Sequence, residues 1–208
     1  MKSKIAIIYY SATGTTYELA RAIEEGAREA GAEVRFRKVK ELAPQEAINS
    51  NEGWSAHAKK TQNVPIATQD DLEWADGVIF GTPTRYGLPT AQLKQFLDQT
   101  GPLWSKGKLA NKIISSFTSA ATKHGGHETT ITALNNTFYH WGSIIVGLGY
   151  VEESQFEAGN PYGASFVSNN GQLDPDETAL VAARLQGKRV TEITTQFLVG
   201  AEMGVENR

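Results

Sequence analysis

Six residues near the N-terminus have the composition of a phosphate-binding loop: Ser11, Ala12, Thr13, Gly14, Thr15 and Thr16. They follow an apolar run, residues 5–10, and precede a segment with helical periodicity, so they form a strand-to-helix turn. A helix N-terminus presents unpaired N–H groups and the positive end of the peptide dipoles, which both attract phosphate. Gly14 allows the backbone to close around a ligand, and the loop contains no Lys or Arg. Amides and hydroxyls would therefore meet the phosphate charge.

The spacing excludes two commoner nucleotide loops. A P-loop is GxxxxGK followed by Ser or Thr, whereas the stretch from Gly101 to Lys108 is one residue too long and Leu109 follows it. Residues 11–16 and 147–152 also lack the GxGxxG fingerprint of dinucleotide-binding proteins. The alternative for residues 11–16 is an ordinary Ser/Thr-rich helix cap, and their position directly after the first strand favours the phosphate site.

The composition and net charge of the chain argue against several classes of function. The 208 residues carry a formal net charge of −3, which gives no electrostatic reason to expect nucleic acid or an anionic membrane as a partner. The chain has no cysteine, so thiolate nucleophiles, Cys-ligated zinc and iron–sulfur clusters are excluded. No apolar run is long enough for a secretory signal or a membrane span, so we expect a cytoplasmic protein with no integral membrane association.

Apolar patterns predict five strands alternating with helices. The strands are expected at residues 5–10, 34–39, 77–81, 113–117 and 144–148, and the last helix is expected to begin with Asp174 as its N-cap. Residues 41–69 lack periodicity and read as a long loop, in which His57 is interpreted as a surface histidine. Residues 152–173, rich in Gly, Asn and Ser, read as an insertion before the last helix.

The alternation predicts an α/β fold and one domain over residues 1–208. Right-handed crossovers would wind the strands into a three-layer α/β/α structure with a five-stranded parallel sheet. The SATGTT loop resembles the phosphate loop of flavodoxin-like proteins, which implies the strand order 2-1-3-4-5 and a ligand beside strands one and three. The loops after strands one, three and four would then meet at one edge.

The other two loops suit a planar ring with a polar edge. The loop after strand three contains Pro83, Thr84, Arg85, Tyr86 and Gly87, and the loop after strand four contains Ser119, Ala120, Ala121, Thr122 and Gly125. Small residues allow a flat ligand to approach backbone amides. Residues 119–126 contain no aromatic side chain, so one ring face would stay open for a substrate to stack on.

Longer motifs give a more specific resemblance. GTPTRYG (81–87), FLDQTGPLW (96–104), NPYGAS (160–165) and ARLQGKRV (183–190) are similar to the corresponding segments of WrbA-type NAD(P)H:quinone oxidoreductases. The resemblance implies FMN as cofactor, NADH or NADPH as co-substrate, two-electron ping-pong transfer to quinones, and a homotetramer.

The resemblance also assigns roles to residues. It places the FMN phosphate on residues 11–16, and the ring against Thr84, Arg85, Tyr86 and the loop after strand four. It makes His140 an FMN contact near the active site and Trp104 a wall of the nicotinamide and quinone pocket. His140, Trp104 and Tyr86 are thus the predicted catalytic residues. Ala12 and Thr13 replace the Met-Tyr pair common in the family, so an aromatic wall expected at Thr13 is missing.

Other functions and roles stay open at this point. A flavodoxin-type electron carrier would bind the same cofactor but needs protein partners, and the weak net charge provides little steering towards them. A flavin-containing interaction protein is a third class. Tyr86 and Trp104 are also compatible with packing, and His140 with a helix-boundary position. His124 and His127 have a metal-compatible spacing, but no third ligand is evident, so no metal site is predicted.

Overall fold

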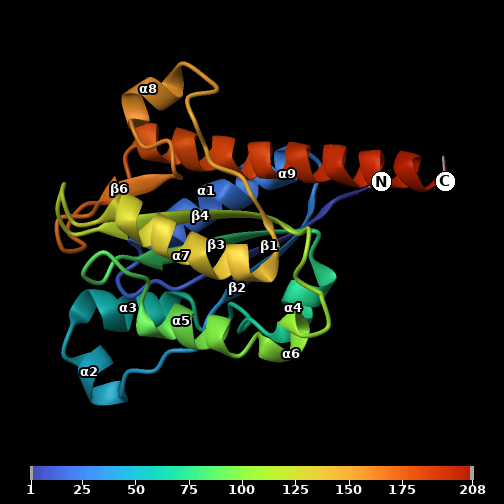
Figure 1. Ribbon diagram of the computed structural model, residues 1–208. Helices are drawn as coiled ribbons and strands as arrows, with labels where there is room; N and C mark the ends of the chain where they lie inside the picture. Colours follow the sequence, from blue (N-terminus) through green and yellow to red (C-terminus); the bar gives the residue numbers. More distant parts are fainter. Residues whose placement is uncertain (1, 207–208) are drawn as a thin grey trace.

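The computed structural model describes residues 2–206, which form a parallel sheet with helices on both faces (Figure 1). The strand order is β2-β1-β3-β4-β5, and each neighbouring pair is parallel. The strands on this path are β1 (Lys4–Tyr9), β2 (Glu33–Lys38), β3 (Gly77–Pro83), β4 (Ile113–Ala120) and β5 (Ile144–Ile145). The predicted order is confirmed.

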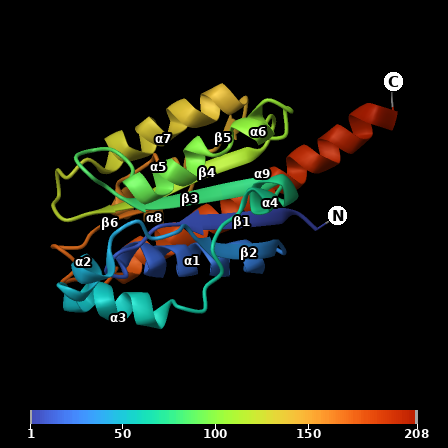
Figure 2. The same cartoon turned by 90° about the horizontal axis from the view of Figure 1, so that it is seen from below.

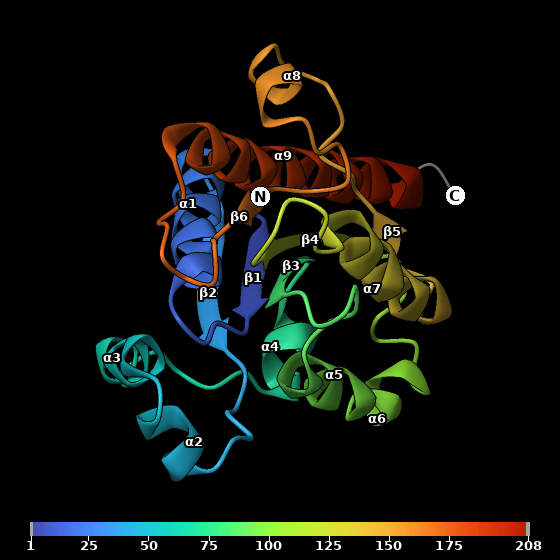
Figure 3. The same ribbon diagram turned by 90° about the vertical axis from the view of Figure 1, so that its left-hand side faces the viewer.

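Helices form the two outer layers of the fold, as Figure 3 shows from the left-hand side of Figure 1. The long helix α9 (Glu177–Glu206) and α1 (Thr15–Glu29) pack together on one face of the sheet. The other face is covered by α4 (Gln69–Trp74), α5 (Ala91–Asp98) and α7 (His127–Trp141). The α/β/α layering expected from the sequence is therefore present.

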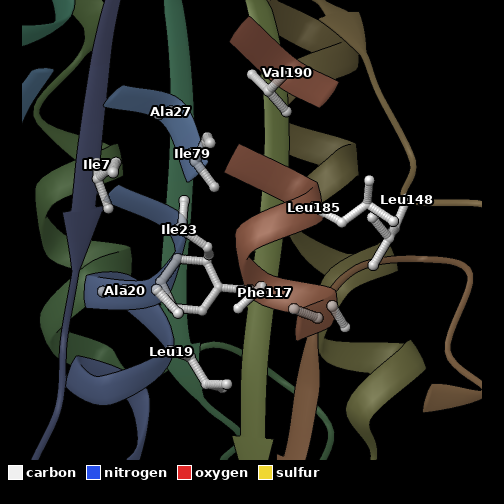
Figure 4. Close-up of a cluster of buried hydrophobic side chains, with 14 of the residues drawn as sticks. Ile7, Leu19, Ala20, Ile23, Ala27, Ile79, Phe117, Leu148, Leu185 and Val190 are labelled. Carbon is white, nitrogen blue, oxygen red and sulfur yellow. The ribbon is translucent and has the colours of Figure 1, made fainter. Parts of the chain in front are cut away.

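The core beneath α1 and α9 depends on close helix packing (Figure 4). Ile7, Ile79 and Phe117 project from three neighbouring strands into this layer and are fully buried. A Cβ atom added to Gly26 of α1 would lie 1.9 Å from the Arg184 carbonyl oxygen of α9, so only glycine permits this approach. These contacts fix the direction of α1, whose N-terminus follows the phosphate loop.

The predicted loop over residues 41–69 is wrong, because this stretch contains two short helices and the start of α4. They are α2 (Gln45–Asn49) and α3 (Glu52–Lys60), and they lie beyond β2, at the edge of the sheet (Figure 2). Side-chain hydrogen bonds hold the segment: Glu41 accepts from the Tyr10 hydroxyl at 2.8 Å and from the Trp54 indole at 3.3 Å. Helices stabilised by such distant contacts leave no apolar periodicity in the sequence.

The fifth strand position is shared by two short strands, which corrects the predicted strand over residues 144–148. β5 pairs with the beginning of β4, whereas β6 (Ser165–Val167), inside the predicted insertion, pairs with Thr118–Ala120 at its end. Between β5 and β6 the chain leaves the sheet and forms α8 (Ser154–Ala158), which protrudes beyond α9 (Figure 1). β6 thereby brings the chain back to the edge where the loops meet.

Trp104 belongs to a short helix, α6 (Gly101–Trp104). The start of the last helix differs from expectation. Asp176, not Asp174, caps α9, because its Oδ1 accepts the Ala179 N–H at 2.9 Å. Within residues 2–206 we find no helix whose length and hydropathy would let it cross a bilayer.

Candidate functional site

A cavity of about 710 Å³ opens where β1, β3 and β4 end. Its volume lies in the range of sites for drug-sized ligands and cofactors. Fourteen of the predicted cofactor residues line it, while Gly14 and Gly87 shape their loops without lining it. The lining residues are Ser11, Ala12, Thr13, Thr15, Thr16, Asn51, Pro83, Thr84, Arg85, Tyr86, Ser119, Ala120, Ala121, Thr122, Gly125, Ser168, Asn170 and Gly171.

The loop over residues 11–16 has the geometry of an anion cradle. Gly14 is the N-cap of α1 with φ 115°, and no side chain caps the first turn of the helix. Its own N–H donates to Ser11 Oγ at 3.1 Å, which holds the loop closed. Thr15 and Thr16 are buried, and the Thr16 hydroxyl lies 2.9 Å from the Ser119 hydroxyl of the loop after β4. The free amides at the start of α1 thus adjoin the cavity.

The loop after β3 is a tight turn tied to the loop after β4. The Thr84 N–H donates to the Ser119 carbonyl at 2.8 Å, and Thr84 Oγ1 accepts the Gly87 N–H at 3.0 Å. Arg85 and Leu88 exchange two backbone hydrogen bonds across the turn. Tyr86 at its tip has φ 55°, a left-handed conformation that is costly for a bulky residue, and its side chain is fully exposed.

Two glycines allow close packing here: Gly126 where the loops after β3 and β4 approach each other, and Gly125 where the loop after β4 folds on itself. A Cβ atom on Gly126, the N-cap of α7, would lie 2.7 Å from the Gly87 Cα atom. A Cβ on Gly125 would lie 2.8 Å from the Ala120 Cβ. The loops therefore enclose the cavity only because glycine occupies these positions.

Four lining residues escaped the sequence analysis: Asn51, Ser168, Asn170 and Gly171. Asn51 caps α3, and the other three form a turn after β6 that is bonded to Ala120 through the Ser168 N–H at 2.8 Å. A Cβ on Gly171 would lie 2.8 Å from Thr13 Oγ1. The wall beside Thr13 is therefore polar where the family resemblance implies an aromatic residue. The feature of the sequence that indicates this turn is Asn-Asn-Gly (169–171), which is typical of left-handed turns.

Trp104 and His140 lie outside this cavity. The Trp104 indole donates to the His140 carbonyl at 2.8 Å, and both side chains are exposed. His140 is near the C-terminal end of α7, whereas the cavity adjoins its N-terminal end. Since a helix rises about 1.5 Å per residue, His140 lies about 20 Å along the axis from His127. The predicted contact of Trp104 and His140 with the site therefore cannot be made within one chain.

His57 is buried, so its interpretation as a surface histidine is wrong. Its side chain packs beside the phosphate loop, with an exposed fraction of 7% for the residue. Burial, together with the positive charges of Lys60 and Lys38, lowers the pKa of His57 to about 4. The imidazole is therefore neutral at neutral pH.

This buried histidine predicts acid sensitivity of the fold. An unfolded histidine has a pKa of about 6.5, so the unfolded chain binds the proton first as the pH falls. We expect the free energy of unfolding to drop between about pH 6.5 and pH 4, by about 3 kcal/mol at most from this group. Urea denaturation at several pH values should show a shallower drop for His57→Phe, with parallel curves above pH 7. An equal slope in both proteins over the acidic range would contradict the assignment.

The cavity fits FMN. Unpaired amides and hydroxyls at the start of α1 suit a phosphate, and small residues of the other two loops admit a flat ring. Arg85 is the only charged residue among the described lining residues.

Within residues 2–206 we find no cluster of His, Asp and Glu able to hold a metal ion. The Nε2 atom of His127 instead lies 3.2 Å from the Phe166 carbonyl oxygen.

Comparisons with known proteins agree with this geometry. The model of the NADPH-dependent FMN reductase family matches residues 3–158. NAD(P)H dehydrogenases (quinone) from Deinococcus radiodurans and Sinorhizobium fredii are 45% and 44% identical to this chain, cover 94% of it, and are matched over 97% and 98% of their own lengths. The crystal structure of a WrbA-like flavodoxin from Agrobacterium tumefaciens superimposes with a TM-score of 0.65 at 26% identity, covering 94% of this chain and 99% of that protein. The chain therefore belongs to the NADPH-dependent FMN reductase family and, within it, to the WrbA-type NAD(P)H dehydrogenases (quinone).

Proposed function

We propose that this protein is an FMN-dependent NAD(P)H:quinone oxidoreductase that works by two-electron ping-pong transfer. The observation that carries the proposal is the cavity in which the phosphate loop, the Thr84 turn and the loop after β4 converge. Its relatives are named NAD(P)H dehydrogenase (quinone), and they match nearly the whole chain. The bound FMN would supply the chemistry, by taking a hydride from NAD(P)H and passing two electrons to a quinone.

The chain's own residues bind and orient the reactants. Residues 11–16 would hold the phosphate, and Thr84 with Ser119–Thr122 would hold the polar edge of the ring. The Arg85 guanidinium, whose Nη1 donates to the Thr84 carbonyl at 2.9 Å, would offset negative charge that arrives with the hydride. His140, from a neighbouring chain, would move a proton to the quinone oxygen through its imidazole.

An open ring face favours an enzyme over an electron carrier. Tyr86 is the only aromatic residue among the described lining residues, and it is fully exposed at the tip of its turn. No aromatic side chain of the loop after β4 covers the opposite side. A substrate therefore has room to stack, which hydride transfer requires and a shuttle between proteins does not.

The positions of Trp104 and His140 support an assembly of several copies, and the assembly that we propose is a homotetramer. Both are exposed and lie far from the cavity of their own chain, so a second copy must present them if they serve a site. Tyr86 is also fully exposed, as expected of a residue that meets a neighbouring chain.

We further propose that the protein is cytoplasmic and that residues 1–208 form one domain.

Anaerobic mixing tests the proposal. FMN-loaded protein is combined with NADH or NADPH while the flavin absorption band is followed, and benzoquinone is then added. We expect bleaching by at least one nucleotide and recovery of the band with quinone. An electron carrier would hold FMN without rapid bleaching, and failure with both nucleotides would end the reductase assignment.

A further inference from the structure

His57 is a buried group for which the reaction has no use, yet it lies beside the phosphate loop. It lies on α3, and its Nδ1 is 3.5 Å from the position of a Cβ atom on Gly14. Its ring meets Tyr17 of α1 edge-on, with 5.3 Å between the ring centroids. The imidazole thus lies beside the loop, next to the space that a side chain on Gly14 would occupy, and contacts the first turn of the helix that the loop begins.

Helix α3 is fastened to that same turn by charge and aromatic contacts. Lys60 Nζ lies 2.7 Å from Glu18 Oε1 and 5.1 Å from the centroid of the Tyr17 ring. The other end of α3 reaches the cavity, since Asn51 lines it and a Cβ on Gly53 would lie 3.8 Å from Thr13 Cγ2. α3 therefore spans the outer side of the phosphate loop.

The space behind the loop is only partly filled. A second cavity of about 150 Å³ is lined by Ser11, Tyr9, Lys38, Glu41, Trp54 and His57, among others. The Tyr9 hydroxyl is buried there and has no hydrogen-bond partner within the described residues. Because His57 lines this cavity, loss of the imidazole would join its volume to an existing cavity.

His57 cannot support the binding of an anion by charge attraction. Lys60, Lys38, Glu18 and Glu41 are the charged groups around it, and its pKa of about 4 leaves it uncharged at neutral pH. Its contribution is therefore one of shape. The neutral ring fills the space beside Gly14, which has φ 115°.

We propose that His57 is a positioning residue that holds the phosphate loop in the conformation that binds the FMN phosphate. The inference rests on the proposed binding of FMN. It separates phosphate recognition from ring recognition, because the neighbours of His57 at the site, Ser11, Gly14 and Tyr17, all belong to the phosphate loop and the helix that follows it.

Binding of FMN and of riboflavin, which lacks the phosphate, tests the inference by quenching of flavin fluorescence. We expect His57→Ala to raise the Kd for FMN by about tenfold or more, and the Kd for riboflavin by less than about twofold, because only the phosphate loop is loosened. His57→Phe keeps the ring and should hold the FMN Kd within about threefold of wild type. Lys59→Ala, an exposed position on the same helix, should change neither value.

The outcomes separate this inference from the assignment of the enzyme. An unchanged FMN Kd in His57→Ala, equal weakening of both flavins, or a loss in His57→Phe as large as in His57→Ala overturns the positioning role. If His57→Ala does not fold, His57→Leu takes its place, and the ratio of its two Kd values decides in the same way. Failure of the wild-type protein to bind FMN would instead overturn the proposed function.

Discussion

Gly126→Ala is expected to weaken FMN binding by about a hundredfold, because one methyl group would separate the two loops that hold the ring. The added Cβ would lie 2.7 Å from the Gly87 Cα, and Gly126 has φ 94°. A left-handed alanine costs about 1–2 kcal/mol. Overpacking adds about 1–3 kcal/mol. The free loops can relieve this strain by moving apart and must be brought together again to bind FMN, so a combined cost of about 3 kcal/mol corresponds to about a hundredfold in Kd. Flavin fluorescence quenching measures the Kd directly.

Gly31→Ala is the matched control for this substitution. Gly31 has φ 91°, close to that of Gly126, but a Cβ there would meet no atom within 4 Å. It follows α1 at the end opposite the phosphate loop, so the backbone cost should appear in stability alone. Thermal unfolding should therefore show a loss for both variants, whereas only Gly126→Ala should lose FMN. Equal FMN affinity in the two variants would mean that the loops tolerate the displacement.

The sequence alone was sufficient to predict the parts of the site that lie at the ends of strands. Residues 5–10 and 77–81 are continuous apolar runs, as buried parallel strands require, so the loops that follow them were placed at one edge. Hydroxyl-rich and glycine-rich loop compositions then indicated a phosphate and a flat ring. Fourteen predicted residues line the cavity because these local signals and the topology agree.

The remaining site residues depend on contacts between distant segments. Ser168 reaches the cavity only because β6 pairs with β4, and a strand of three residues leaves too short a pattern to recognise. Asn51 caps α3 and His57 lies on it, and this helix is stabilised through Tyr17, Glu18 and Glu41 rather than by an apolar face of its own. His57 was interpreted as exposed because its sequence neighbours are polar. His57 is buried by α1, and because α1 is distant in the sequence, local patterns around His57 do not indicate this contact.

Trp104→Ala is expected to reduce quinone reduction by about tenfold or more while FMN affinity stays unchanged, because the indole is remote from the cavity of its own chain. Its Nε1 is bonded to the His140 carbonyl, beside the end of α7 that is distant from the site. Steady-state NADH oxidation with benzoquinone gives the rate, and fluorescence quenching gives the FMN Kd. A weaker FMN affinity together with the loss of rate would instead indicate a role within the same chain.

Mixing this variant with Gly126→Ala shows whether the tryptophan acts between chains. The Trp104→Ala variant has an intact cavity but no Trp104. The Gly126→Ala variant has Trp104, but at an FMN concentration well below its raised Kd its own cavity stays largely without FMN. If chains assort at random in a tetramer and each cavity borrows one neighbour's tryptophan, co-refolding equal amounts should restore about a quarter of the wild-type activity. Separately refolded proteins, combined afterwards at low concentration, serve as the control. A co-refolded mixture no more active than this control would exclude a shared site, because within a single chain neither variant supplies both parts.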